Sequence, residues 1–264
     1  MNFDYTKRDV QASEITPIAV SRFDMDAYAE YETKLLERTA AFAAASEGVA
    51  VYLPMSFTDA QSPLNASMMI VNTNNFLMDT LINPEGVQLF LNRLADLAID
   101  FVEKQKKMIG DCLVNPGHGF ASARNFAGYG QSSDNFLMLS DEQYIQCALP
   151  AFLKLGTAFG GPVFHSCGNF SSRMNTIRAI EGLRCIDAAF SSETDPDPNP
   201  PVPFAEALAG TGIILNARIV GNLEMIEKAV RQFWRPGMKL IVVTYCQTLE
   251  EQREAYDLIH DICR

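Results

Sequence analysis

Short apolar runs alternate with longer helical patterns along this chain, and that alternation restricts the fold more than any other feature. The short apolar runs lie at 50–54, 111–115, 135–139, 162–167, 185–190, 213–219 and 240–246, with an eighth candidate at 15–20. Helical patterns lie at 25–46, 75–108, 141–158, 171–181, 222–233 and 248–262. Strands that alternate with helices form parallel βα units. In a chain of 264 residues they predict a single α/β domain, a (β/α)8 TIM-type barrel.

The pattern also predicts where the chain departs from this regular alternation. Residues 1–48 are expected to form a helical N-terminal region with a candidate first strand, and residues 49–264 the α/β barrel. Pro150 lies inside a helical pattern and predicts a kink or a split there. The proline-rich stretch 193–201 predicts a loop.

The charge balance excludes one class of partner. Acidic residues outnumber basic ones by 32 to 21, giving a net charge of −11, which opposes the phosphate neutralisation that nucleic-acid binding requires.

No stretch approaches the roughly 18 apolar residues of a membrane helix, and the N-terminus lacks the apolar segment of a secretory signal. We therefore expect a soluble, cytoplasmic protein with no membrane partner, whose hydrophobic content also permits a homodimer.

Three residues form a candidate metal site. His165 and Cys167 are two residues apart at the end of one apolar run, so their side chains point the same way if that run is a strand. Cys246 ends another such run, and the carboxyl ends of barrel strands meet at one face. Imidazole and thiolate are ligands that zinc prefers, and three of them leave one coordination position open. Judged by spacing alone, residues in such positions pack in the core more often than they bind a metal.

The other cysteines and histidines give weaker signals. A chain of this size without a secretion signal is expected to keep its thiols reduced. We expect the remaining cysteines in the core; they are Cys112, Cys147, Cys185 and Cys263. His118 lies between two glycines in a candidate loop, and His260 fits the surface or the packing of the last helix.

Three segments of the sequence resemble those of a known family. HSCGNF (165–170), followed much later by a strand-terminal cysteine, resembles the H-x-C…C zinc signature of the methylcobalamin:coenzyme M methyltransferases of the uroporphyrinogen decarboxylase superfamily. TDAQSPLNASMMIVNTNNFLMDTLINPEGV (58–87) and SDNFLMLSDEQYIQCALPAFLKL (133–155) are also similar to segments of that superfamily. The arginine-rich N-terminal motif of its decarboxylase branch is missing here, which argues against porphyrinogen decarboxylation.

The resemblance implies an α/β barrel and a zinc-dependent methyltransferase. Its zinc, held by His165, Cys167 and Cys246, would bind a thiol such as coenzyme M, or a similar acceptor such as a folate, and the methyl group would come from a methylated corrinoid (methylcobalamin). The sequence carries no D-x-H-x-x-G cobalamin motif, so the corrinoid would arrive on a partner protein. Two alternatives stay open: a lyase that acts on a small acid, and a non-catalytic subunit of a corrinoid methyltransferase system.

Further residues beside these motifs are candidates for binding, each with a structural alternative. Asp134 and Glu193 lie in predicted loops, and either could supply a displaceable fourth zinc ligand. The structural alternative for Asp134 is a residue that caps a loop, and for Glu193 it is a charge exposed to solvent. Arg218 ends the run at 213–219 and could pair with an anionic substrate group or form a structural salt bridge. Three more could line the pocket or bond to local backbone: Tyr129, Asn169 and Tyr245.

Overall fold

A computed structural model describes residues 33–34, 36–38, 40–41, 44, 56–58, 61–115, 123 and 125–264. The strands predicted at 15–20 and 50–54 lie outside the described residues, as does His118. The described residues between 33 and 44 are helical, as the pattern at 25–46 predicts.

The described part of the chain forms an α/β fold around a parallel sheet. Its five strands are β1 (Tyr129–Ser132), β2 (Pro162–His165), β3 (Cys185–Ala189), β4 (Ile214–Arg218) and β5 (Lys239–Val243). They lie side by side in the order β1-β2-β3-β4-β5, and every neighbouring pair is parallel. The predicted strands at 162–167, 185–190, 213–219 and 240–246 are thereby confirmed.

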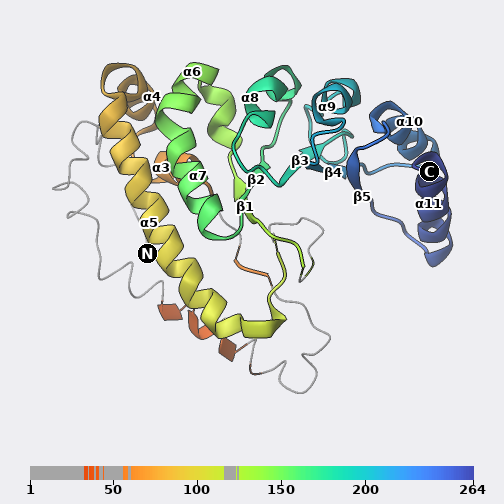
Figure 1. Cartoon of the computed structure of the whole chain (residues 1–264), viewed down its shortest axis with the longest axis horizontal. Helices are drawn as coiled ribbons and strands as arrows, with labels where there is room; N and C mark the ends of the chain where they lie inside the picture. The colour runs from red at the N-terminus through yellow and green to blue at the C-terminus, as the bar shows by residue number, and fades with distance from the viewer. Residues whose placement is uncertain are drawn as a thin grey trace.

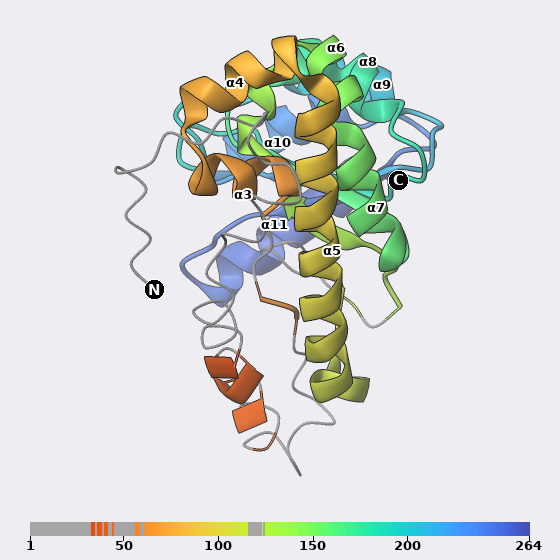
Figure 2. The same cartoon turned by 90° about the vertical axis from the view of Figure 1, so that its left-hand side faces the viewer.

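Helices precede the sheet and connect its strands. They are α3 (Pro63–Ile70), α4 (Thr73–Ile82), α5 (Pro84–Ile109), α6 (Asp141–Gln143), α7 (Leu149–Ala158), α8 (Met174–Arg178), α9 (Pro201–Leu208), α10 (Leu223–Phe233) and α11 (Leu249–Ile262). Figure 1 shows α8, α9, α10 and α11 along an arc outside the strands. In Figure 2, α4 lies across one end of the long α5, which also packs against α7. Among the described helices, none is long and apolar enough to span a membrane.

The two faces of the sheet carry different side chains. Phe164, Ile186 and Leu215 are paired across β2, β3 and β4 and are completely buried in the main hydrophobic core with the helices. On the opposite face, Val163 and Cys185 form a small separate apolar cluster. Cys185 is therefore a core residue, as expected, and its burial raises the pKa of its thiol.

The helix around Pro150 continues instead of splitting. A π-helical turn at 144–148 joins α6 to α7, with the N–H of Leu149 bonded to the carbonyl of Tyr144. Pro150 has no N–H for the carbonyl of Gln146, and the side chain of Gln88 donates to that carbonyl at 3.1 Å. The wider turn and the donor from α5 together accommodate the proline.

Two predicted strands are wrong. Residues 110–112 form a 3-10 turn, and beyond it Asn115 makes only an isolated antiparallel bridge to Ala123. Residues 134–138 form another 3-10 turn, in which Phe136 is completely buried while Leu137 and Met138 are partly exposed. The apolar run at 135–139 reflects one anchoring side chain rather than a buried strand. The strand itself lies earlier, at β1, outside the apolar runs from which strands were predicted.

Candidate metal centre

Polar side chains gather at the carboxyl end of the sheet because of its register. Ser132, His165, Asp187 and Asn216 are successive pairing partners on β1 to β4 and so share one level and one face. This face is opposite to the one that meets the helices at Phe164, Ile186 and Leu215. The level forms a polar layer above the small apolar cluster of Val163 and Cys185.

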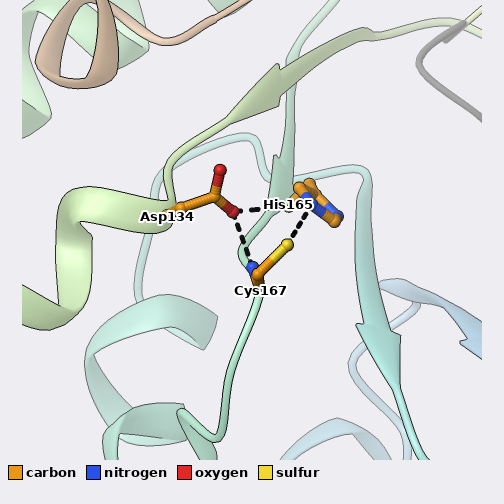
Figure 3. Close-up of side chains that lie close together, drawn as sticks. All are labelled: Asp134, His165 and Cys167. Carbon is orange, nitrogen blue, oxygen red and sulfur yellow. Dashed lines mark hydrogen bonds and ion pairs between the residues drawn. The ribbon is translucent and has the colours of Figure 1, made fainter. Parts of the chain in front are cut away.

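Asp134, His165 and Cys167 come together at this end of the sheet. One ligand atom from each lies within 4.8 Å of the others. His165 Nε2 is 3.6 Å from Cys167 Sγ and 3.6 Å from Asp134 Oδ1. Figure 3 shows the Asp134 carboxylate and the Cys167 thiol on the same side of the His165 imidazole. Of the sequence-predicted ligands, the structure therefore brings His165, Cys167 and Asp134 into one cluster.

The other ring nitrogen of His165, Nδ1, contacts the Asp187 carboxylate. Nδ1 lies 2.5 Å from Asp187 Oδ2, and both side chains are almost completely buried. Asp187 in turn accepts a 2.5 Å hydrogen bond from the Asn216 amide on Oδ1, and Arg218 Nε lies 3.0 Å from Oδ2. Both carboxylate oxygens of Asp187 are therefore engaged by the sheet's own side chains.

Asp134 is held by a second set of donors. Its Oδ1 accepts the backbone N–H of Cys167 at 2.6 Å, and its Oδ2 accepts the Ser132 hydroxyl at 2.9 Å and the Asn65 amide of α3 at 3.2 Å. Burial opposes ionisation of this carboxyl, but these donors and the nearby His165 outweigh it, so the pKa of Asp134 is lowered. Asp134 is a carboxylate whose position does not depend on a metal.

Cys167 is exposed at the mouth of the cluster. The residue is exposed as a whole but its sulfur is partly buried against His165. This partial burial, followed by the Asp134 and Asp195 carboxylates, raises the pKa of the thiol to about 11, although Arg218 acts in the opposite direction. The next residue, Gly168, adopts φ +74° and donates its N–H to Asp195 at 2.8 Å. A Cβ there would lie 2.9 Å from Leu137, so glycine allows the chain to turn away beside the thiol.

The donor set fits a zinc ion. Zinc bonds of about 2.3 Å to sulfur and about 2.0–2.1 Å to nitrogen, at the tetrahedral angle, place the two ligand atoms about 3.6 Å apart. His165 Nε2 and Cys167 Sγ have that separation. A bound histidine commonly donates its other N–H to a carboxylate, as Nδ1 of His165 is placed to do with Asp187. The residues that could hold the ion are His165, Cys167 and Asp134.

Cys246 is not part of this cluster in the structure. β5 ends at Val243, so Cys246 lies three residues beyond the strand, and its half-buried side chain packs against the main core. β5 is also three strand spacings from β2, each about 4.8 Å. Among the described residues, the cluster contains Asp134, His165 and Cys167 alone.

The remaining predicted residues lie in different surroundings. Glu193 is exposed and accepts a hydrogen bond from Ser192, and Tyr245 is 72% exposed after β5. Asn169 accepts hydrogen bonds from the N–H and hydroxyl of Ser171, a local backbone cap. Tyr129 is buried, with its ring 5.1 Å from that of Phe159 and packed in the main core.

Several residues of the site were missed from the sequence. Asp187 and Asn216 support His165, and Asn65 supports Asp134. A signal for the first two exists: each is a single polar residue inside an otherwise apolar buried run, CIDAA and ILNAR. Two such residues on neighbouring parallel strands indicate a shared polar layer.

Comparisons with known proteins give no family assignment. A scan against models of protein families finds no match, and a search of curated proteins finds no significant similarity.

Proposed function

We propose that this protein is a zinc-dependent methyltransferase, which moves a methyl group from a methylated corrinoid on a partner protein to a thiol or a similar acceptor. One observation carries the proposal: an imidazole backed by a carboxylate lies at zinc-ligand separation from a solvent-exposed thiol, with a second carboxylate beside both. The motif resemblance supplies the reaction class.

The proposed fold is a complete (β/α)8 barrel of which the described sheet is a part. Consecutive parallel strands in unbroken order favour this, because a doubly wound sheet reverses its order at a switch point. Right-handed connections in one direction also place all helices on one side, as the arc of helices in Figure 1 suggests. The candidate site would then lie at the carboxyl-end mouth, where barrel enzymes hold their catalytic groups.

Each residue of the cluster has a distinct proposed task. His165 and Cys167 would bind the metal persistently. Cys246 lies outside the cluster in the structure and stays a proposed further ligand, so Cys246→Ser should lower zinc affinity if it binds the ion. Asp134 is the displaceable ligand. Its release from a bound metal would cost little, because Ser132, Asn65 and the Cys167 N–H would continue to satisfy its oxygens.

The zinc ion would supply the positive charge that keeps an acceptor thiol in its nucleophilic thiolate form near neutral pH. The corrinoid would supply the methyl group: the acceptor thiolate would form the new bond to the methyl carbon, and the electron pair of the broken bond would stay with the corrinoid. Cys167, exposed at the mouth, lies where the acceptor approaches. The apolar Leu137 beside Gly168 is partly exposed at the same place.

A second candidate function follows from the same distances. Cys167, His165 and Asp187 are aligned as in a thiol-nucleophile triad, with Sγ 3.6 Å from Nε2 and Nδ1 2.5 Å from the carboxylate. Two observations favour the metal instead. The backbone N–H groups of Cys167 and Gly168 already bond to the carboxylates of Asp134 and Asp195, so they are not available as an oxyanion hole. Those carboxylates also repel an anionic intermediate and raise the pKa of the thiol.

The test is a methyl-transfer assay with the full chain loaded with zinc. A methylated corrinoid protein is mixed with candidate thiols and a folate acceptor, and the visible spectrum of the corrinoid is followed. Demethylation that depends on zinc, on Cys167 and on acceptor supports the proposal. Demethylation with no acceptor at all, or thiol-ester hydrolysis by the zinc-free protein, would overturn it in favour of a lyase, a non-catalytic subunit or the cysteine triad.

A further inference from the structure

We propose that Asp187 is the positioning residue that sets the tautomer of His165, so that Nδ1 carries the proton and Nε2 presents its lone pair to the metal site. This inference deepens the proposed function and rests on the same site. It assigns a role to a buried carboxylate that lies between the candidate ligands and Arg218.

Two carboxylates compete for the imidazole of His165. Asp187 Oδ2 lies 2.5 Å from Nδ1, within a hydrogen bond, while Asp134 Oδ1 lies 3.6 Å from Nε2, beyond one. The Asp187 side chain is 4% exposed, whereas that of Asp134 is 39% exposed, so water weakens the second interaction much more. The single N–H proton of the neutral ring therefore lies on Nδ1, the nitrogen that faces Asp187.

Asp187 can perform this task because its own position is fixed. Asn216 donates to Oδ1, and Arg218 Nε lies 3.0 Å from Oδ2, the same oxygen that meets His165. An ionised carboxylate has only acceptor sites, so the hydrogen between Oδ2 and Nδ1 must belong to the imidazole. The Arg218 guanidinium keeps the buried carboxylate compensated in charge.

This arrangement gives Arg218 a role that differs from contact with a substrate. Its Nε faces Asp187 on the neighbouring strand, and the register places it one strand further from Cys167 than Asp187 lies. Arg218 therefore acts on the metal site through Asp187, as a positioning residue. Asn216 acts in the same way on the opposite oxygen.

The consequence is a site that is arranged before metal arrives. A histidine with the opposite tautomer would have to move a proton before Nε2 could bind, and its ring would be free to rotate. Carboxylates that orient a ligand histidine typically contribute about 10–100-fold to metal affinity. We expect the loss of Asp187 to weaken zinc binding by that factor.

The experiment reads the tautomer directly in the metal-free full chain. The sequence contains three histidines, so a protein labelled with 15N-histidine gives a spectrum of three imidazole rings, and His165→Gln identifies one of them. Two-bond 1H–15N correlations are recorded at about pH 8.5, about two units above the ordinary imidazole pKa. The expected wild-type result is a proton on Nδ1 of His165.

The variants then separate positioning from simple structural support. Asp187→Ala combined with Arg218→Met removes the carboxylate without leaving an unpaired guanidinium, and the Asp134 carboxylate, 3.6 Å from Nε2, stays in place. The tautomer of His165 should switch to Nε2–H, and zinc affinity, measured by competition with a chelator, should fall about 10–100-fold. Asp195→Asn is the matched control, because it removes one buried carboxylate beside Cys167 without touching His165.

Each outcome decides the inference. A wild-type proton on Nε2, or an unchanged tautomer in the folded double variant, would overturn it. If the double variant does not fold, as judged by its circular dichroism, the wild-type tautomer alone decides. Because the tautomer is read without metal, a wild-type protein that binds no zinc would refute the proposed function and leave this inference standing on its own result.

Discussion

Replacing the exposed thiol should remove the stabilisation that zinc gives to the fold. Cys167→Ser changes one atom at the mouth of the cluster, and a hydroxyl is a poor zinc ligand beside a thiolate. Since the side chain is exposed, the free energy of unfolding without metal should change by less than about 0.5 kcal/mol. Any larger difference between the two proteins must then come from bound metal.

The size of the effect follows from ligand linkage. A metal present at about 100 times its dissociation constant stabilises the folded state by about 2.7 kcal/mol. For a chain of this length, each kcal/mol shifts the unfolding midpoint by about 2–4 °C, so zinc should raise the midpoint of the wild type by about 5–10 °C. With only the imidazole and carboxylate of His165 and Asp134 left in the cluster, the variant should show little of this shift.

The assay is thermal unfolding followed by circular dichroism, with and without zinc at matched free concentrations. Cys263→Ser is the matched control, because Cys263 is partly buried at the far end of α11 and outside the cluster. It should keep the full zinc-dependent shift. Equal shifts in Cys167→Ser and wild type would show that zinc binds elsewhere and would refute the reasoning.

Three further predictions concern the scaffold. Gly156→Ala should lower the free energy of unfolding by about 1–3 kcal/mol, because a Cβ there would lie 2.5 Å from the Cα of Pro162 at the start of β2. Gln88→Leu should cost about 0.5–1 kcal/mol, because it removes the donor to the carbonyl of Gln146. Asp141→Asn should cost about 0.5–1 kcal/mol at neutral pH, the value of a solvent-screened ion pair, and less in acid. All three are measured by denaturant unfolding.

The controls for these predictions are further variants and pH values. The cost of Gln88→Leu should disappear in a Pro150→Ala background, where residue 150 regains an N–H; an unchanged cost would contradict the account of the π-helical turn.

Slight burial opposes ionisation of Asp141, but Thr176 and Arg173 outweigh it and lower its pKa. A lowered folded-state pKa gives stability that is present above the ordinary value of about 3.9 and is lost as the pH falls through the folded value. A cost of Asp141→Asn that grows in acid would contradict this.

Four of the five strands could be predicted from the sequence, and burial explains why. β2, β3 and most of β4 are buried in the parallel sheet, and β5 is half-buried, so each appears as a short, largely apolar run bounded by turns. β1 could not be recognised, because YGQS has no such character and is held by pairing to β2 and by burial. The run at 135–139 is apolar because Phe136 fills the core, where it packs on Phe164 at 5.4 Å between ring centroids.

Part of the candidate site was also within reach of sequence reasoning. The spacing of His165 and Cys167 is meaningful through strand geometry alone, and Asp134 was a candidate because it lies in a predicted loop. Asp187 was missed although a single polar residue inside an apolar run is a signal for it. Asn65 was missed because its role depends on α3 lying beside the turn that follows β1. Such neighbours are a property of the tertiary fold, which no local pattern contains.

The most direct test of the central claim is the zinc X-ray absorption spectrum of the full chain loaded with one equivalent of the metal. If His165 and Cys167 share the ion, the first shell contains sulfur at about 2.3 Å together with nitrogen or oxygen at about 2.0–2.1 Å, and Cys167→Ser loses one sulfur. A first shell made of oxygen and nitrogen alone, or an identical shell in the variant, would contradict the claim.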